Sequence, residues 1–104
     1  MTKHILTIGL NDKDTKLQKY DILTCYKLVE SVLKQHVDGY TITQALGGYK
    51  HDDGTYVSET SLRVELLFTD TKTIKLIANA IKAPTCLNQE SIAYEKVTTK
   101  GELL

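Results

Sequence analysis

Two short polar stretches, far apart in the sequence, carry side chains suited to binding a small polar ligand. Asn11-Asp12-Lys13 follows an apolar segment near the N-terminus, and Asn88-Gln89-Glu90 precedes another near the C-terminus. Together they offer amide donors and acceptors, a cation and two carboxylates, a set that suits a base edge, a sugar or an amide. The alternative is that both are ordinary loops. In the free protein we expect water to satisfy their amides, so that replacing them costs little stability.

Two further surfaces are candidates. The stretch from Gly47 to Glu59 is longer than a minimal turn and holds two tyrosines, a lysine, His51 and three acids. Its tyrosines, and Tyr49 in particular, are candidates to contact a ligand or a partner protein. The alternative is that they pair with residues across the strands of a projecting ribbon. The third candidate is the strand face that carries Arg63, the only arginine, which is either a subunit or ligand contact or a solvated surface residue.

No pattern in the chain predicts catalysis or a metal. There is no serine-nucleophile motif, phosphate-binding loop or dinucleotide fingerprint. His4, His36 and His51 lack ligand spacing, and Cys25 and Cys86 lie far apart, which is typical of reduced, apolar cysteines. We therefore predict no catalytic residue, no metal and no cofactor, and an enzyme is the less favoured reading.

Composition excludes several classes of protein. The 13 basic and 13 acidic side chains cancel, which argues against duplex nucleic acid as a partner, since phosphate binding needs a clustered basic excess. No apolar run approaches the roughly 20 residues of a spanning helix, and the N-terminus lacks the apolar stretch of a signal peptide. We expect one cytoplasmic domain over residues 1–104, with no membrane contact.

The elements that position these residues follow from hydrophobic periodicity. We expect strands over His4–Leu10, Tyr40–Lys50, Thr55–Thr69 and Ser91–Val97, with Leu62, Val64, Leu66 and Phe68 facing the core. Helical spacing runs from Asp21 to Asp38-Gly39, and again from Asp70 or Thr71 to just before Pro84. Asp53-Gly54 predicts the tip of a hairpin.

The order βαββαβ predicts an α+β, ferredoxin-like fold. We expect a four-stranded antiparallel sheet with both helices on one face and a long hairpin between the second and third strands. Within it, we expect the first strand to lie at the centre, parallel to the third and antiparallel to the fourth. That pairing brings the loops at Asn11 and Asn88 to one edge of the sheet. The uncovered face, with Ile5, Thr7, Ser61, Arg63 and Glu65, predicts that the protein is not a monomer.

The layout resembles the nitrogen-regulatory PII and CutA-type proteins. The likeness covers about Gly39 to Ile81: a strand entering Gly47-Gly48-Tyr49, a protruding loop, and a return strand before a helix. The resemblance implies trimers that bind nucleotides or metabolites in clefts between subunits and use the long loop to touch partners. Leu87-Asn88-Gln89-Glu90-Ser91 replaces the family's glycine-rich phosphate-binding stretch, so ATP binding is not implied. The composition, rich in lysine and poor in arginine, is similar to that of small proteins from AT-rich Firmicutes or their phages.

Two hypotheses follow. The first is a non-enzymatic homo-oligomeric module that binds a small polar ligand, of nucleotide type, to sense or sequester it, as in a phage counter-defence protein. Its ligand-binding residues would be Asn11, Asp12, Lys13, Tyr49, Arg63, Asn88, Gln89 and Glu90. The alternative is an inhibitor or adaptor that binds a host protein through the 47–59 hairpin and an exposed strand edge.

Overall fold

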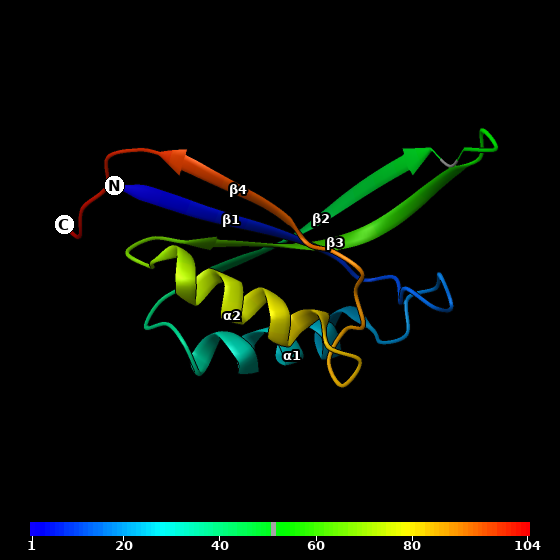
Figure 1. Ribbon diagram of the computed structural model, residues 1–104, viewed down its shortest axis with the longest axis horizontal. Coiled ribbons are helices and arrows are strands. Elements are labelled where there is room, and N and C mark those ends of the chain that lie inside the picture. Colours follow the sequence, from blue (N-terminus) through cyan, green and yellow to red (C-terminus); the bar gives the residue numbers. More distant parts are fainter. Residues whose placement is uncertain (51) are drawn as a thin grey trace.

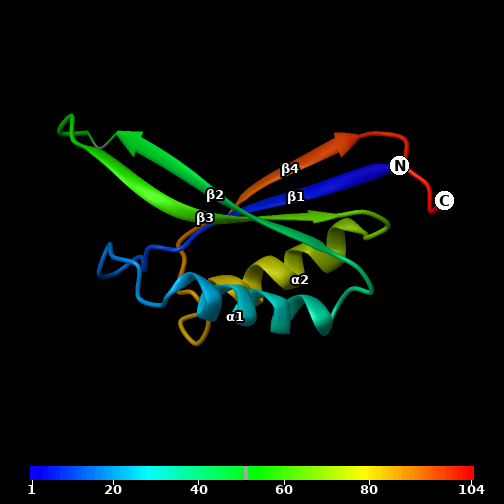
Figure 2. The same ribbon diagram turned by 180° about the vertical axis from the view of Figure 1, so that it is seen from behind.

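The computed structural model describes residues 1–50 and 52–104. Its elements are β1 (Thr2–Gly9), α1 (Ile22–Lys34), β2 (Thr41–Lys50), β3 (Tyr56–Leu66), α2 (Thr71–Lys82) and β4 (Ala93–Thr98). The strands form one sheet in the order β2-β3-β1-β4. Both helices lie on the same face of that sheet, and the other face has no helix over it (Figures 1 and 2). The ferredoxin-like α+β fold predicted from the sequence is confirmed.

The expected parallel pairing of the first and third strands is wrong. β1 and β3 are antiparallel, with His4 opposite Leu66 and Ile8 opposite Leu62. The reason lies in the connections: the crossover through α1 makes β2 run parallel to β1, and the β2–β3 hairpin then reverses the chain. The pairing of β1 with β4 is antiparallel, as expected.

Each helix begins at an aspartate cap. Asp21 Oδ1 accepts a hydrogen bond from the N–H of Thr24, and Asp70 Oδ1 accepts one from Thr73, both at 2.7 Å. α2 ends at Lys82 because the next residue has the extended backbone favoured shortly before Pro84. In the described part of the chain, no helix is long and apolar enough to cross a bilayer.

The core lies between the sheet and the two helices. Leu62, Val64 and Leu66 of β3 are buried in it, as the alternation predicts. The prediction for Phe68 is wrong, since its side chain is 62% exposed. β3 stops at Leu66, and Phe68 lies in the turn before α2 with a left-handed backbone, φ 60°, where strand alternation no longer applies.

The β2–β3 hairpin extends past the helices and gives the molecule its long axis (Figures 1 and 2). The ladder continues to the pair Lys50 and Tyr56. Gly54, at φ 92°, takes a turn conformation that residues with a side chain rarely adopt. His51, included in the hairpin as a candidate contact, lies outside the described residues.

Candidate functional site

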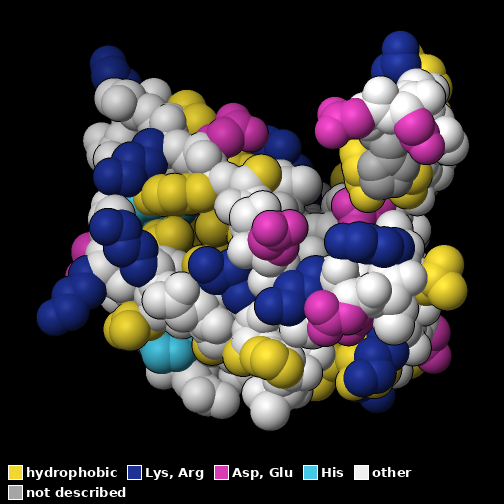
Figure 3. Space-filling model, turned by 45° about the vertical axis from the view of Figure 1, so that its right-hand side comes forward, with side chains coloured by type: hydrophobic (Ala, Val, Ile, Leu, Met, Phe, Trp, Pro, Cys, Tyr) yellow, Lys and Arg dark blue, Asp and Glu magenta, His cyan; other side chains and the backbone are white. Residues whose placement is uncertain are grey.

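A cleft of about 420 Å³ opens at the end of the sheet where the central strand β1 stops. Its walls come from the loop after β1, the loop before β4 and the inner part of the hairpin. Figure 3 shows the hairpin as a separate column, with the surface falling away into a hollow beside it. Six of the residues predicted to bind a ligand line this cleft: Asn11, Asp12, Lys13, Tyr49, Gln89 and Glu90.

Asp12 and Asn88 join the two loops beneath the cleft. Asp12 Oδ1 accepts hydrogen bonds from the N–H groups of Asp14 and Thr15, at 2.8 and 3.1 Å. Asn88 Nδ2 donates to Asp12 Oδ2 and to Asp14 Oδ2, both at 2.9 Å. These bonds, first from Asn88 and then from the backbone, hold the pKa of Asp12 below its usual range. Asp12 is therefore an ionised structural carboxylate.

The amides of Asn88 and Gln89 are not solvated, which corrects the expectation from the sequence. Each residue is only 9% exposed. Gln89 Nε2 donates to the carbonyl oxygens of Asn11 and Leu87, at 2.6 and 3.2 Å. Asn88 lies behind the cleft, outside its lining residues, and its backbone carbonyl accepts from the N–H of Lys13 at 3.0 Å. Both amides hold the loops together, so replacing them will reduce stability as well as any binding.

Glu59 is a cleft residue that the sequence analysis did not select. Its Oε2 accepts a hydrogen bond from the N–H of Asn11 at 3.1 Å, and its carboxylate lies against Gly9. Glu59 and Tyr49 are on the same face of the hairpin, since their ladder partners are Gly47 and Val57. Glu59 reaches the cleft because of the register between β2 and β3, and the sequence alone does not determine that register.

Charged side chains of both signs surround this cleft. Lys13 and Lys16 lie on the side of the loop after β1, and Glu59 and Glu90 lie on the walls formed by the hairpin and the loop before β4. Lys16 has a left-handed backbone, φ 63°, and Asn88 behind the cleft has φ 49°. Residues held in such sparsely populated conformations cluster at ligand sites. The arrangement fits a ligand that carries both positive and negative charge.

Arg63 is not among the residues that line the cleft, although it borders it: Thr7, its partner in the ladder, and Ser61, its neighbour on the same strand face, both line the cleft. Its Nε is 3.4 Å from Oε1 of Glu65, in a pair of which more than a third of each side chain is exposed. Such surface pairs contribute little stability. On the same uncovered face, Ile5 and Ser61 are buried within the single chain. That face therefore exposes less apolar surface to solvent than its sequence pattern indicates.

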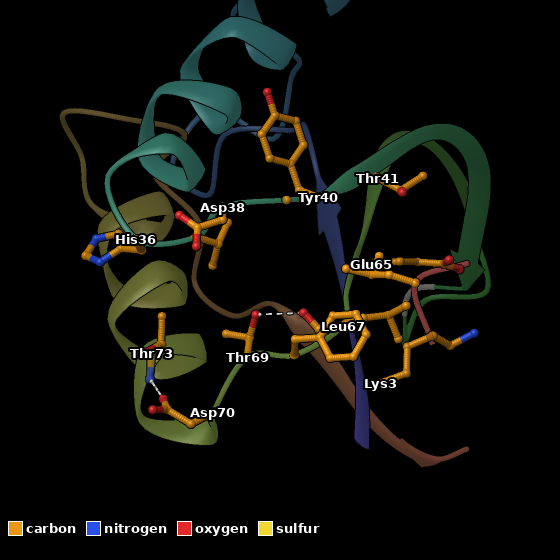
Figure 4. Close-up of a pocket in the computed structure, with 14 residues that line it drawn as sticks. Lys3, His36, Asp38, Tyr40, Thr41, Glu65, Leu67, Thr69, Asp70 and Thr73 are labelled. Atoms are coloured by element: carbon orange, nitrogen blue, oxygen red, sulfur yellow. Dashed lines mark hydrogen bonds between the residues drawn. The ribbon is translucent and has the colours of Figure 1, made fainter. Parts of the chain in front are cut away.

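A larger cavity, about 720 Å³, lies at the opposite end of the sheet, between the turns around residues 36–41 and 67–73 (Figure 4). Several of its polar groups make structural hydrogen bonds. Asp70 caps α2 through Thr73, and the hydroxyl of Tyr40 points toward α1, where it donates to Glu30 at 2.5 Å. The exposed ring of Phe68 adds an apolar wall. The smaller cleft is the one that brings together most of the residues predicted to bind a ligand, with charged side chains of both signs.

The described residues offer no cluster of three or more histidine, cysteine, aspartate or glutamate side chains that could hold a metal ion. Cys25 and Cys86 are both free thiols in the core. Burial raises the pKa of each thiol, which keeps it protonated and unreactive.

Comparison with known proteins gives matches in structure only. No protein-family model matches the chain, and no curated protein matches its sequence. A phage SAM lyase in complex with S-methyl-5'-thioadenosine matches with a TM-score of 0.68 and 18% identity, over 92% of this chain and 79% of the lyase. The periplasmic divalent cation tolerance protein CutA from Archaeoglobus fulgidus matches with a TM-score of 0.62 and 7% identity, over 97% of this chain and 87% of CutA.

A PII-like protein has the same fold. The B. subtilis GlnK–ATP complex matches with a TM-score of 0.50 and 12% identity, over 92% of this chain and 82% of GlnK. The resemblance to CutA and PII proteins seen in the sequence layout is thus confirmed at the level of the fold. At these identities the chain is similar to all three proteins in architecture, and that architecture is what the likeness shows.

Proposed function

We propose that this protein binds S-adenosylmethionine in the cleft at the end of β1 and cleaves it to S-methyl-5'-thioadenosine. The observation that carries the proposal is the carboxylate of Glu59 in a cleft that also holds two lysines. A similar fold in a phage SAM lyase bound to S-methyl-5'-thioadenosine supports the choice of ligand. The proposal replaces the non-enzymatic reading favoured by the sequence, which contains no catalytic motif.

The charges around the cleft match the parts of this ligand. S-adenosylmethionine carries a sulfonium cation, an amino-acid carboxylate and an ammonium group. Lys13 and Lys16 would bind the carboxylate, Glu90 the ammonium group, and Glu59 would lie near the sulfonium. The ring of Tyr49 would stack on the adenine or contact the cation. ATP, with its triphosphate, fits poorly beside two glutamates.

The reaction breaks the bond between the sulfonium sulfur and Cγ of the amino-acid arm. An oxygen of the substrate's own carboxylate attacks Cγ, so that a C–O bond forms as the C–S bond breaks. Sulfur keeps the electron pair of the broken bond and leaves as the neutral thioether S-methyl-5'-thioadenosine, while the amino-acid arm leaves as homoserine lactone with its ammonium group unchanged. A lyase carries out this step without water. Glu59 would hold the sulfonium in place, so that Cγ is oriented for this attack.

A second copy of the chain would complete the site. The resemblance to CutA and PII proteins implies trimers with ligand clefts between subunits. The cleft is open to solvent in the single chain. The sheet face without helices is available for assembly (Figures 1 and 2). We also propose a cytoplasmic location, where the two buried thiols would stay reduced.

The test is calorimetric binding of S-adenosylmethionine, S-methyl-5'-thioadenosine and ATP, with mass spectrometry of the products after incubation. We expect S-adenosylmethionine to bind and to yield S-methyl-5'-thioadenosine. Glu59→Gln should lose about 10²-fold in turnover. Glu102→Gln, in the exposed C-terminal segment outside the cleft and outside the sheet, is the control and should match wild type. Absence of binding and of product in wild type would refute the proposal, and binding without product would favour sequestration.

The hairpin supports a second candidate function, docking onto another protein. Leu46 and Tyr56 are 79% and 74% exposed on one face of the projecting ribbon, and Lys50 Nζ lies 5.7 Å from the centroid of the Tyr56 ring. An exposed leucine, tyrosine and lysine on a ribbon are the kind of side chains that anchor a protein contact. Affinity capture with wild type and with a Leu46→Ser/Tyr56→Ser variant tests it. A partner captured by wild type and lost by the variant, with no ligand found in the cleft, would favour the adaptor.

A further inference from the structure

Gly9 makes room for the carboxylate of Glu59. A Cβ built on Gly9 would lie 2.5 Å from Oε1, 2.6 Å from Cδ and 2.6 Å from Oε2 of Glu59. All three distances are far below van der Waals contact. The backbone of Gly9 is not left-handed, since Gly54 is the one glycine with positive φ. The carboxylate of Glu59 fills the space beside Gly9, and a side chain at position 9 would displace that flexible group.

The backbone of Asn11 holds the same carboxylate from the other side. Its N–H donates to Glu59 Oε2 at 3.1 Å, while its carbonyl oxygen accepts from the buried amide of Gln89 at 2.6 Å. The preceding N–H, of Leu10, donates to the carbonyl of Thr60 at 3.0 Å and fixes the loop on β3. The peptide groups around Asn11 are thus held at both ends, and the N–H aimed at Glu59 has little freedom to move.

Gly47 provides an internal comparison. It lies directly opposite Glu59 in the β2–β3 ladder. A Cβ on Gly47 would approach only the backbone oxygen of Glu59, at 3.9 Å, which is ordinary contact. A methyl group at position 47 therefore leaves the carboxylate where it is, whereas a methyl group at position 9 cannot.

We propose that Gly9, the N–H of Asn11 and the side chain of Gln89 form a positioning unit that fixes the Glu59 carboxylate in the cleft. The role of this unit in binding the sulfonium rests on the function proposed above. These residues act through Glu59 and need not touch the ligand. Without the unit, the flexible glutamate side chain would sample several rotamers and would lose its fixed place beside the ligand.

The first test needs no ligand. In the free protein, the amide proton of Asn11 should resonate downfield, as expected for a hydrogen bond to a carboxylate. Gly9→Ala and Glu59→Gln should both shift it, and Gly47→Ala should leave it unchanged. An Asn11 resonance that does not respond to Gly9→Ala would overturn the positioning unit, whatever the ligand proves to be.

The second test uses S-adenosylmethionine. Gly9→Ala should lower turnover by about 10²-fold, while Gly47→Ala stays near wild type. Denaturant unfolding of each variant checks that it folds. If wild type shows neither binding nor cleavage, the proposed function fails while the amide-proton test still decides the positioning unit. If wild type is active and Gly9→Ala equals it, the positioning unit fails alone.

A double-mutant cycle separates positioning from a general loss of structure. Glu59→Asp shortens the side chain by one methylene and withdraws it from the space above Gly9. The effect of Gly9→Ala should therefore be several-fold smaller in the Glu59→Asp background than in wild type, giving a clear coupling between the two sites. Additive effects would mean that Gly9→Ala acts elsewhere, and would refute the inference.

Discussion

The side-chain amide of Asn88 donates to the carboxylate of Asp12 at 2.9 Å across 76 residues of sequence. This contact connects the loop before β4 to the loop after β1. Of the buried side-chain nitrogen and oxygen atoms described by the structure, Oδ1 of Asn88 is the one without a hydrogen-bond partner. Its Nδ2, in contrast, is shared between Asp12 and Asp14, so the amide is oriented by the two carboxylates.

Removing this amide should destabilise the protein. Asn88→Ala leaves the buried Asp12 carboxylate short of a donor, at a cost of about 1–3 kcal/mol. It also places alanine at φ 49°, a further cost that Asn88→Gly avoids. We expect both variants to unfold at lower urea concentration, with alanine the less stable. Equal stability of wild type and Asn88→Gly would contradict the structural role of the amide.

Glu30 and Tyr40 predict a specific alkaline titration. The hydroxyls of Tyr26 and Tyr40 both donate to Oε2 of Glu30. The bond to Glu30 raises the pKa of Tyr40 to about 12. Because its pKa in the folded state lies above the unfolded value of about 10, its contribution to stability is complete below that pH and is lost as pH rises through 12.

Ultraviolet absorbance of phenolate measures this directly. The bond to Glu30 also raises the pKa of Tyr26. Of the six tyrosines, we therefore expect Tyr40 and Tyr26 to ionise late, and Tyr40→Phe to reduce the amplitude of the late component. Glu30→Gln should bring it to lower pH, whereas Glu95→Gln, on the exposed strand β4, should not. A late component of unchanged amplitude in Tyr40→Phe would contradict the assignment.

The order and type of the elements could be predicted from the sequence because they depend on local signals. Asp21 and Asp70 precede clear helical periodicity, and Leu62, Val64 and Leu66 alternate. The end of β3 could not be predicted, because the apolar Phe68 continues the alternating pattern into the turn that follows the strand. The meeting of the two polar loops followed from topology, but the burial of Gln89 and the place of Glu59 depend on side-chain contacts across strands, which no local pattern encodes.

Leu66→Ala tests the register of the sheet. Leu66 is completely buried between the sheet and the helices, and truncating such a leucine costs about 2–5 kcal/mol. Leu46→Ala, at an exposed position of the hairpin, should change stability by less than about 0.5 kcal/mol. Denaturant unfolding of both variants measures the difference. A loss at Leu66 no greater than that at Leu46 would contradict the register.

Self-association is expected to use the uncovered sheet face. Multi-angle light scattering at micromolar concentration should give a mass above that of one chain. Thr43→Arg would add a second cation to this face, opposite Arg63 in the ladder. It should weaken assembly because a charge without a partner would have to be removed from water at the interface. Thr98→Arg, at the end of β4, is the control. A monomeric wild type would refute the proposal that a second copy completes the cleft.

Lys13 and Lys16 should distinguish the substrate from its nucleoside product. Both line the cleft, and the amino-acid carboxylate of S-adenosylmethionine is absent from S-methyl-5'-thioadenosine. Lys13→Ala and Lys16→Gly should each weaken binding of S-adenosylmethionine about two- to fivefold, the range for a partly exposed ion pair, and leave binding of the product unchanged. Glycine is chosen at position 16 because Lys16 has φ 63°.

Lys19→Ala, in the same loop but outside the cleft lining, is the control for these two variants. Calorimetry at low and high salt should show the loss of affinity shrinking as salt screens the charges. Equal losses for both ligands would mean that the lysines do not bind the carboxylate, and that the ligand lies differently in the cleft.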